Sequence, residues 1–329
     1  DGRGRQRLMS ARTGARRVGP LVAAIVALLL FFRFVLGVEI FLSPRNLINL
    51  MEQISVDAIL AFGMTLTILI GGIDLSVGRV TALTGTVTVY WLARNGDAPE
   101  SAVELATALI VGLGAAAIVG SVNGTLAAKS RMPPFIITLA MLMVTRGLAL
   151  SFNEARPIPV PRPEAAFLAI GNYQILDLVP IPVVVMLAVF FAMVVILHAT
   201  RFGQHLYAIG GNREAARFAG IATERHEIIV YVLCSTLAGV AGIIQASQLN
   251  AAVPAAGEGL ELNAIAAAVV GGTSFTGGVG TMHGTLLGAI IIGILNKGLN
   301  QAGVHFSLQY LVKGLVILAA VYLDVWRRK

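Results

Sequence analysis

Ten apolar stretches, each about long enough to cross a lipid bilayer, fill most of this 329-residue sequence. The hydrocarbon core of a bilayer is about 30 Å thick, and an α-helix needs about 20 apolar residues to cross it. Hydrophobic residues make up 57% of the chain and charged residues only 12%, too few for the surface of a soluble protein of this size. The sequence therefore predicts an all-α membrane protein, a polytopic bundle of about ten transmembrane helices. The predicted spans are residues 20–38, 46–70, 75–93, 101–128, 134–152, 178–198, 227–249, 262–279, 284–302 and 306–325.

The chain divides into a short basic tail and one long apolar domain. Residues 1–19 carry six arginines and one acidic residue, and they resemble the n-region of a signal peptide. Arg33 and Phe34 stand where a cleavage site is expected, which predicts a retained first helix. No linker or change in composition divides residues 20–329. We therefore predict a single transmembrane domain after a cytoplasmic tail.

The placement of Lys and Arg predicts the orientation, because positively charged loops stay on the cytoplasmic side. An even number of spans puts the basic tail, residues 129–131, the 200–226 loop and the basic end at 326–329 on one side. Loops on the other side carry few charges or mainly acidic ones. We expect a multi-pass protein of the bacterial inner membrane with both termini in the cytoplasm. The net charge of +7 then reflects topology, not binding to nucleic acid.

The sequence carries no recognisable catalytic or metal-binding motif. Residues 124–130 end like a phosphate-binding loop, but Asn123 and Ala128 stand where that pattern requires glycine. The five histidines are scattered without the spacing of metal ligands, and the single cysteine, Cys234, lies inside an apolar stretch. These observations predict a transport subunit without an enzymatic site, cofactor or metal of its own.

Two glycine-rich breaks interrupt the apolar stretches and mark a candidate substrate pathway. The first reads GGIDLSVG at 71–78, and the second reads GGTSFTGG at 271–278. Broken helices at membrane depth line pathways in transporters, although the spacing alone is equally typical of tight turns. The candidate pathway residues are Gly71, Gly72, Asp74, Ser76, Gly272, Thr273, Ser274 and Phe275, with Asp57 and Asn123 from neighbouring spans.

Asp57 stands out because it is an acidic residue well inside a predicted span. A charge in hydrocarbon costs free energy, so it is expected to face water, a substrate or a structural partner. Arg146, Lys297 and Lys313 lie nearer the ends of spans, where long side chains reach the interface. Asn123 has the alternative role of a polar contact between helices. Small residues at every fourth position, at 112–124 and 280–288, predict helix-packing seams.

The 200–226 loop is the one large basic interruption and predicts a docking element. Asn212 is a good N-cap, and the residues up to 219 predict a short helix that Gly220 ends. Arg213 and Arg217 are four residues apart on one face, beside a small apolar face of alanines. A cytosolic partner or, alternatively, anionic lipid would cover this helix. The candidate docking residues are Gly211, Asn212, Arg213, Glu214, Ala215, Ala216, Arg217 and Gly220.

Four sequence blocks, in this order, resemble the permease subunits of ribose-type monosaccharide importers of the ATP-binding-cassette (ABC) class. They are IGGIDLSVG at 70–78, PPFI at 133–136 with RGLA at 146–149, AIGGNREAA at 208–216, and GEGLEL at 257–262 with GGTS at 271–274. The resemblance runs from about residue 46 to Asp324. Asp57 and Lys297 depart from it, because uncharged residues are expected at these positions.

The resemblance implies a membrane-embedded permease that pairs with a second copy, most simply as a homodimer. A periplasmic or extracellular binding protein would deliver a ribose-like pentose or related sugar. A separate cytosolic ATPase would hold ATP and Mg, and residues 210–221 would be the coupling helix that it contacts. The alternative is a proton- or ion-coupled secondary transporter, a class that places acidic residues near the membrane midplane, as Asp57 is placed.

Overall fold

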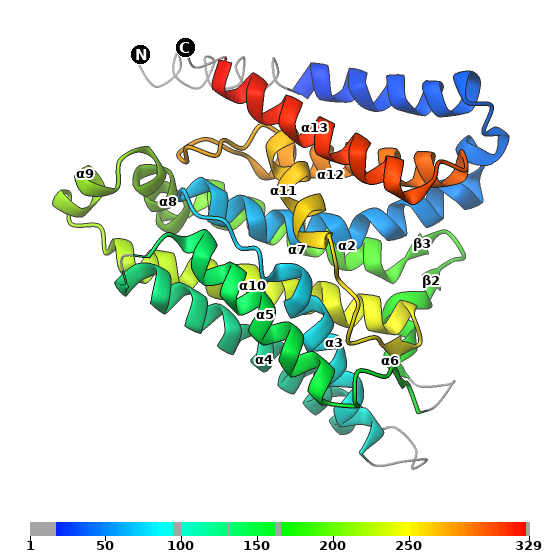
Figure 1. Ribbon diagram of the computed structural model, residues 1–329, viewed down its shortest axis with the longest axis horizontal. Helices are drawn as coiled ribbons and strands as arrows, with labels where there is room; N and C mark the ends of the chain where they lie inside the picture. The colour runs from blue at the N-terminus through cyan, green and yellow to red at the C-terminus, as the bar shows by residue number, and fades with distance from the viewer. Residues whose placement is uncertain (1–17, 95–100, 131, 162–165, 327–329) are drawn as a thin grey trace.

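The computed structural model describes residues 18–94, 101–130, 132–161 and 166–326. These residues form a bundle of helices with four two-residue strands (Figure 1). Strand β1 (Ile158–Pro159) pairs with β4 (Ala251–Ala252), and β2 (Gln174–Ile175) pairs with β3 (Val179–Pro180), both antiparallel. The predicted basic tail lies, except for its last two residues, outside the described residues.

Long helices occupy the places of the predicted spans. They are Val18–Val35, α2 (Pro44–Leu69), α3 (Val77–Ala93), α4 (Ala102–Lys129), α5 (Pro134–Ser151), α7 (Ile181–Ala199), α10 (Thr223–Gln248), α12 (Met282–Gln301) and α13 (Phe306–Trp326). Shorter helices complete the described residues: η2 (Glu39–Leu42), α6 (Ala166–Asn172), α8 (Arg201–Gly211), α9 (Arg213–Phe218) and α11 (Leu260–Val270). The first long helix ends in a π-helical turn at Phe31–Val35.

Among the described residues, seven helices are long and apolar enough to cross a membrane. Each of the ten predicted spans contains a helix, but α3 has 17 residues and α11 only 11. An 11-residue helix is about 16 Å long, roughly half the thickness of the hydrocarbon core. The predicted span at 262–279 is therefore wrong in its second half. The helix ends at Val270 because the glycine pair turns the chain, with Gly272 at φ 92°.

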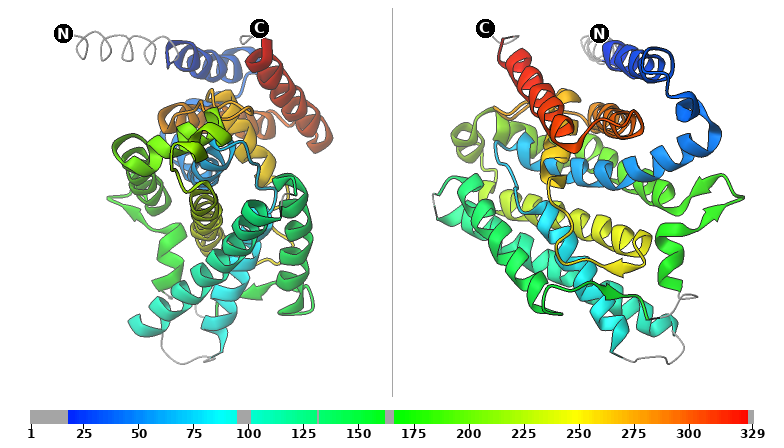
Figure 2. Two further views of the ribbon diagram at one scale, coloured as in Figure 1. Left: turned by 90° about the vertical axis from the view of Figure 1, so that its left-hand side faces the viewer. Right: turned by 45° about the vertical axis from the view of Figure 1, so that its right-hand side comes forward.

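Helices α2 and α10 form the centre of the bundle. α2 is buried along most of its length and packs against α7, α10, α11 and α12, while α10 packs against α2, α3 and α4. The first helix and α13 lie together on one outer side of the bundle (Figure 2). The molecule therefore has a buried polar and apolar interior surrounded by more exposed apolar helices.

The predicted seam on α4 is confirmed as a close helix contact. A Cβ at Gly120 would lie 2.6 Å from the carbonyl oxygen of Tyr231, and one at Gly124 would lie 2.7 Å from the Cα of Ile228. Real Cβ atoms do not approach other atoms that closely, so only glycine permits this spacing of α4 and α10. The second seam likewise lets the start of α12 touch α11, through Gly284 and Gly288.

The two ends of the bundle differ in structure. Helices α8 and α9 project at one end, and the β2–β3 hairpin lies at the other (Figure 1). α3 and α11 both begin inside the bundle and not at an end (Figure 1). The fold thus brings two helix starts into its interior, where the polar residues lie.

Candidate transport pathway and coupling site

Asp57 lies in the interior between α2, α11 and α13. It is 4% exposed, and its Oδ1 accepts a hydrogen bond of 3.3 Å from Nδ2 of Asn263 on α11. The positive charge of Lys313 on α13 also attracts this carboxylate. Asp57 therefore has both a hydrogen-bonding and an electrostatic partner, which offset part of the cost of its burial.

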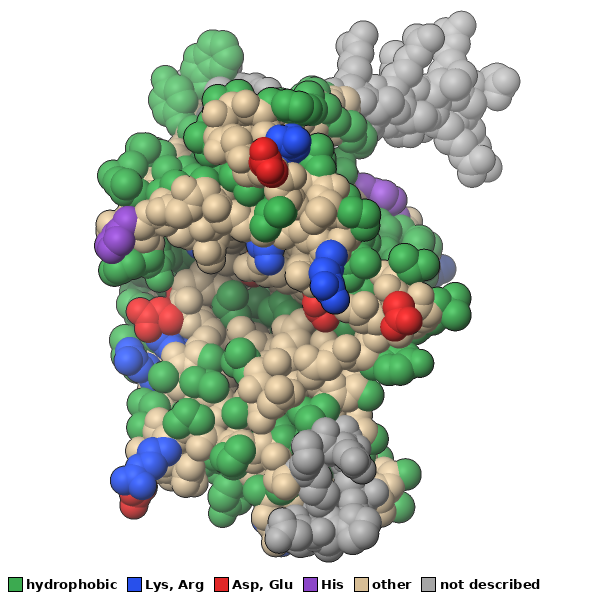
Figure 3. Space-filling model, turned by 90° about the vertical axis from the view of Figure 1, so that its right-hand side faces the viewer, with side chains coloured by type: hydrophobic (Ala, Val, Ile, Leu, Met, Phe, Trp, Pro, Cys, Tyr) green, Lys and Arg blue, Asp and Glu red, His purple; other side chains and the backbone are tan. Residues whose placement is uncertain are grey.

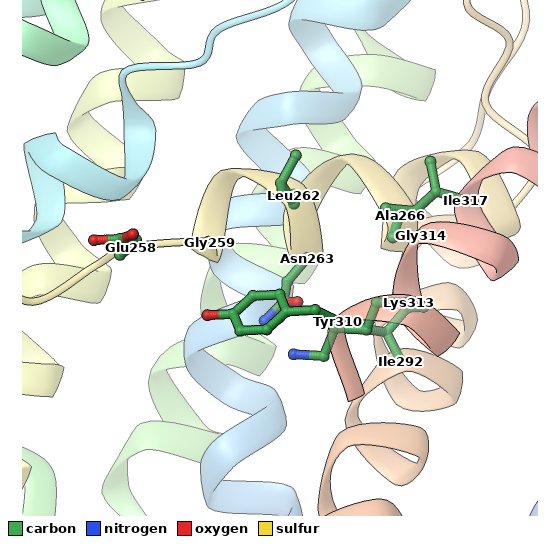
Figure 4. Close-up of a pocket in the computed structure, with 10 residues that line it drawn as sticks. All are labelled: Glu258, Gly259, Leu262, Asn263, Ala266, Ile292, Tyr310, Lys313, Gly314 and Ile317. Atoms are coloured by element: carbon green, nitrogen blue, oxygen red, sulfur yellow. The ribbon is translucent and has the colours of Figure 1, made fainter. Parts of the chain in front are cut away.

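A cavity of about 120 Å³ lies beside this contact. Figure 4 shows Asn263 of α11 and Tyr310 and Lys313 of α13 on its wall, with Glu258 at one edge. Apolar residues of α11, α12 and α13 form the rest of the lining. An amide, a phenol, an ammonium and a carboxylate supply several hydrogen-bond donors and acceptors, the set that an uncharged polyol requires.

The first glycine break contains a buried polar cluster. Asp74 Oδ1 accepts hydrogen bonds from the backbone N–H and the hydroxyl of Ser76, at 2.9 and 2.6 Å. Nδ2 of Asn123 on α4 donates to the same hydroxyl at 3.0 Å. Asp74, Ser76 and Asn123 are fully buried. The predicted pathway residues of the first break are thus joined to α4 and fix the start of α3.

Arg79, which the sequence analysis missed, ties the start of α3 to the start of α11. Its guanidinium donates to the carbonyl oxygens of Ala255 and Ala256, at 3.0 and 3.1 Å, and forms an ion pair of 2.9 Å with Glu258. Gly78 and Gly257 touch each other directly beneath this contact. A basic residue in an apolar stretch was a signal for Arg79, but its partners lie far away in the sequence.

The second glycine break lies beside the end of α2, at the end of the bundle that carries α8. The backbone N–H of Gly278 donates to the carbonyl oxygen of Leu69 at 2.8 Å. Thr273 and Ser274 are buried, Phe275 is half-buried and Gly272 is exposed. The predicted pathway residues therefore fall in three places: Asp57 near the cavity, the Asp74 cluster, and the second break.

Helix α8 packs directly on the second break. The Tyr207 hydroxyl donates to the carbonyl oxygen of Gly280 at 2.7 Å, and Gly210 touches Leu69 and Gly278. Burial raises the pKa of Tyr207 to about 12, so the hydroxyl keeps its proton at physiological pH. Helix α8 of the basic loop is thus in contact with the end of α2 and with the second glycine break.

The predicted short helix of the basic loop is confirmed as α9. Asn212 caps its first turn, because Oδ1 accepts from the backbone N–H of Ala215 at 2.9 Å. Gly220 follows the helix at φ 85°, a conformation that favours glycine. Gly211 ends α8 in open surroundings, and Glu214, Ala215 and Arg217 are exposed.

One expectation about the surface of α9 is wrong. Ala216 does not lie on an outer face, because it is buried against the core. Arg213 is 45% exposed and forms an ion pair with Glu227 of α10, which is 3% exposed. The hydrogen bond that Arg213 donates to Glu227 raises the pKa of Arg213. The outermost apolar side chain is instead Phe218, which is 92% exposed.

A helical bundle with membrane-length helices, two helices that begin in its interior and buried polar clusters beside them defines a polytopic membrane transport protein. The chain belongs to the family described as the permease component of branched-chain amino acid transport systems, whose model matches residues 46–321.

Curated relatives are similar over most of the chain. The ribose import permease protein of Escherichia coli K12 is 46% identical over 286 residues, which are 86% of this chain and 87% of the relative. That of Bacillus subtilis 168 is 43% identical over 284 residues, 86% of each chain. The D-allose transport system permease protein of E. coli K12 is 35% identical over 291 residues, 88% of this chain and 86% of the relative. These relatives confirm the resemblance to ribose-type permeases. No solved structure is significantly similar to the chain.

Proposed function

We propose that this chain is the permease subunit of an ABC importer that moves a monosaccharide, a ribose-like pentose or a related sugar, across the bacterial inner membrane. The observation that carries the proposal is the 43–46% identity to two ribose import permeases over 86% of the chain. The family description names amino acids, whereas these two relatives, which are similar over 86–87% of their own length, are named for ribose.

The cavity beside Asp57 is where we expect sugar hydroxyls to meet the protein. A carboxylate accepts two hydroxyl hydrogen bonds at once, and the Lys313 ammonium donates to ring or hydroxyl oxygens. Asp74, Ser76 and the second break supply polar backbone and side chains further along the bundle. We propose that this chain contributes no metal or cofactor to the passage of the sugar.

We further propose the partners that the resemblance implies. A cytosolic ATPase, which holds ATP and Mg, docks on α9, and both termini of the chain face the cytoplasm with α9. A periplasmic or extracellular sugar-binding protein docks on the opposite end. Figure 3 looks onto that end, where the surface is hollowed near its centre and Lys, Arg, Asp and Glu side chains surround the hollow. A second permease copy completes the membrane assembly.

The direct test is uptake of labelled ribose into proteoliposomes that contain the chain with its ATPase and binding protein. Uptake should require ATP and persist when an uncoupler removes the pH gradient. Uptake by this chain alone, driven by a gradient without ATP, would contradict the proposal and support a secondary transporter.

The docking role of α9 is tested with Phe218→Asp, because Phe218 is exposed and makes no part of the core. We expect weaker ATPase binding, measured by co-purification, with the permease still inserted and folded. Leu176→Asp is the matched control, since Leu176 is 85% exposed in the β2–β3 hairpin at the other end. Equal ATPase binding by both variants would show that α9 is not the docking element.

A further inference from the structure

Glu227 and Tyr231 connect α9 to the first glycine break through one face of α10. They are four residues apart, so they lie one above the other on the same side of the helix. Glu227 holds Arg213, the first residue of α9. Tyr231 is fully buried one turn deeper, and its hydroxyl lies against Gly72: a Cβ at that glycine would be 2.5 Å from the hydroxyl oxygen.

The surroundings of Tyr231 leave it little room to move independently of α10. A Cβ added at Gly124 of α4 would lie 3.2 Å from the Cβ of Tyr231. Gly120 of α4 lies against the backbone of Tyr231. A displacement of the first turn of α10 is therefore passed to the tyrosine hydroxyl with the helix. The close glycine contacts along α4 hold α10 directly against it.

Two buried polar atoms meet at the far end of this connection. Oδ1 of Asp74 has its two bonds from Ser76, but Oδ2 has no hydrogen-bond partner among the described residues, and neither has the Tyr231 hydroxyl. Asp74 is close enough for its charge to act on Tyr231. A buried donor and a buried acceptor that are near each other and unpaired favour any movement that joins them.

We propose that Arg213, Glu227 and Tyr231 are positioning residues that carry a movement of α9 to the first glycine break. In the second state of the transporter, the Tyr231 hydroxyl donates a hydrogen bond to Oδ2 of Asp74 and thereby resets the start of α3. The inference deepens the proposed function, because it rests on α9 being the element that the ATPase moves. The contact between the Tyr231 hydroxyl and Oδ2 of Asp74 then has two arrangements, one without and one with a hydrogen bond. Coupling between distant sites requires an element with two such arrangements.

The experiment uses the complex of permease, ATPase and binding protein in lipid nanodiscs, with ribose as the substrate. ATP hydrolysis is measured without and with ribose-loaded binding protein, and assembly is measured by co-purification of the ATPase. Tyr231→Phe keeps the ring and removes only the hydroxyl, and Asp74→Asn keeps the shape and removes the free acceptor. Tyr231→Phe is expected to preserve assembly and basal hydrolysis, and both variants are expected to lower the substrate-stimulated rate roughly tenfold.

A double-mutant cycle separates a shared contact from two unrelated defects. The double variant Tyr231→Phe/Asp74→Asn should lose no more stimulation than either single variant, because both remove the same bond. Additive losses, or a normal stimulated rate in Tyr231→Phe, would overturn the proposed contact.

The connection to α9 is tested by exchanging charges. Arg213→Glu and Glu227→Arg should each uncouple stimulation, and the two together should restore much of it. Arg225→Glu, on an exposed position in the same turn of α10, is the matched control and should behave as the unmodified protein. If the double exchange fails to restore stimulation while the complex assembles, the ion pair is not part of the connection.

Failure of the proposed function gives a different result from failure of this inference. If the unmodified complex is not stimulated by ribose, or Phe218→Asp leaves ATPase binding intact, the sugar-import or docking proposal is wrong. Suppose instead that ribose stimulates the unmodified complex and that Phe218→Asp weakens ATPase binding. If the Tyr231, Asp74 and charge-exchange variants then behave normally, the positioning role alone is wrong.

Discussion

Two buried charged side chains in the interior of this bundle, Asp57 and Arg79, have partners on distant segments of the chain. Asp57 of α2 meets Asn263 of α11 and the charge of Lys313 on α13, and Arg79 of α3 meets the loop before α11. Because an unpaired charge in hydrocarbon is strongly unfavourable, these contacts fix the register between helices. A substitution of Asp57 should therefore affect transport, and a substitution of Arg79 should affect the packing of the segment before α11.

Asp57→Asn should reduce ribose transport only modestly, whereas Asp57→Leu should reduce it much more. Asparagine keeps the shape and one acceptor for Asn263 or a hydroxyl, and leucine keeps neither. The measurement is the initial rate of ATP-driven uptake into proteoliposomes. Equal losses in both variants would mean that the negative charge is required, as in a proton-coupled carrier.

Arg79→Met should loosen the segment before α11 and lower the stability of the detergent-solubilised protein by about 1–3 kcal/mol. The substitution keeps an apolar stem but leaves the carbonyl oxygens of Ala255 and Ala256 without their donor. Thermal unfolding and limited proteolysis within 253–259 measure the effect. Arg94→Met is the control, since Arg94 is exposed at the end of α3 and only stacks on Trp91. Equal destabilisation by both would contradict the role of Arg79.

At the scale of elements, composition and hydrophobic length predict where helices lie, but not where α11 ends. Its predicted span runs on to residue 279, yet the helix ends at Val270, where Gly272 takes a positive φ and Gly271 lies against Gly284 of α12. The short α9 was predictable from Asn212 and Gly220, which act locally. Which of its faces is buried was not, because a six-residue helix has too few residues to show a periodic pattern.

Contacts between distant segments were the other unpredicted part. Arg79 and Glu258 are far apart in the sequence. Arg213 and Glu227 are 14 residues apart, and the turn between α9 and α10 lies between them. Nothing local in either partner indicates the pairing. The burial of Ala216 likewise follows from the position of α9 against the core and not from its own sequence.

Gly210→Ala should separate α8 from the end of α2, because a Cβ at this position would collide with the backbone of Leu69 and Gly278. We expect a lower unfolding temperature and a loss of most ribose-stimulated ATP hydrolysis. The matched control is Gly211→Ala, whose Cβ would meet no atom within 4 Å. Alanine favours a helix over glycine by up to about 1 kcal/mol, so the control should be neutral or slightly more stable. Two variants that behave alike would show that the contact of α8 with the second break is unimportant.

At the scale of the whole molecule, one end carries α8 and α9 and the other carries the β2–β3 hairpin (Figure 1). If the first end is cytoplasmic, Leu176→Cys should react with a membrane-impermeant maleimide in intact spheroplasts, and Phe218→Cys should react only in inverted vesicles. The native Cys234 is buried and should give no background. The opposite labelling pattern would reverse the orientation.

The central place of α2 also sets the order in which the protein can be assembled as it is made. α2 is synthesised early, yet three of the helices that cover it, α10, α11 and α12, lie in the last third of the chain. Until the later helices emerge from the ribosome, Asp57 has neither Asn263 of α11 nor Lys313 of α13 beside it. Nascent chains that stop before α10 should accordingly be recognised by quality-control proteases, because the buried carboxylate of Asp57 still lacks both partners.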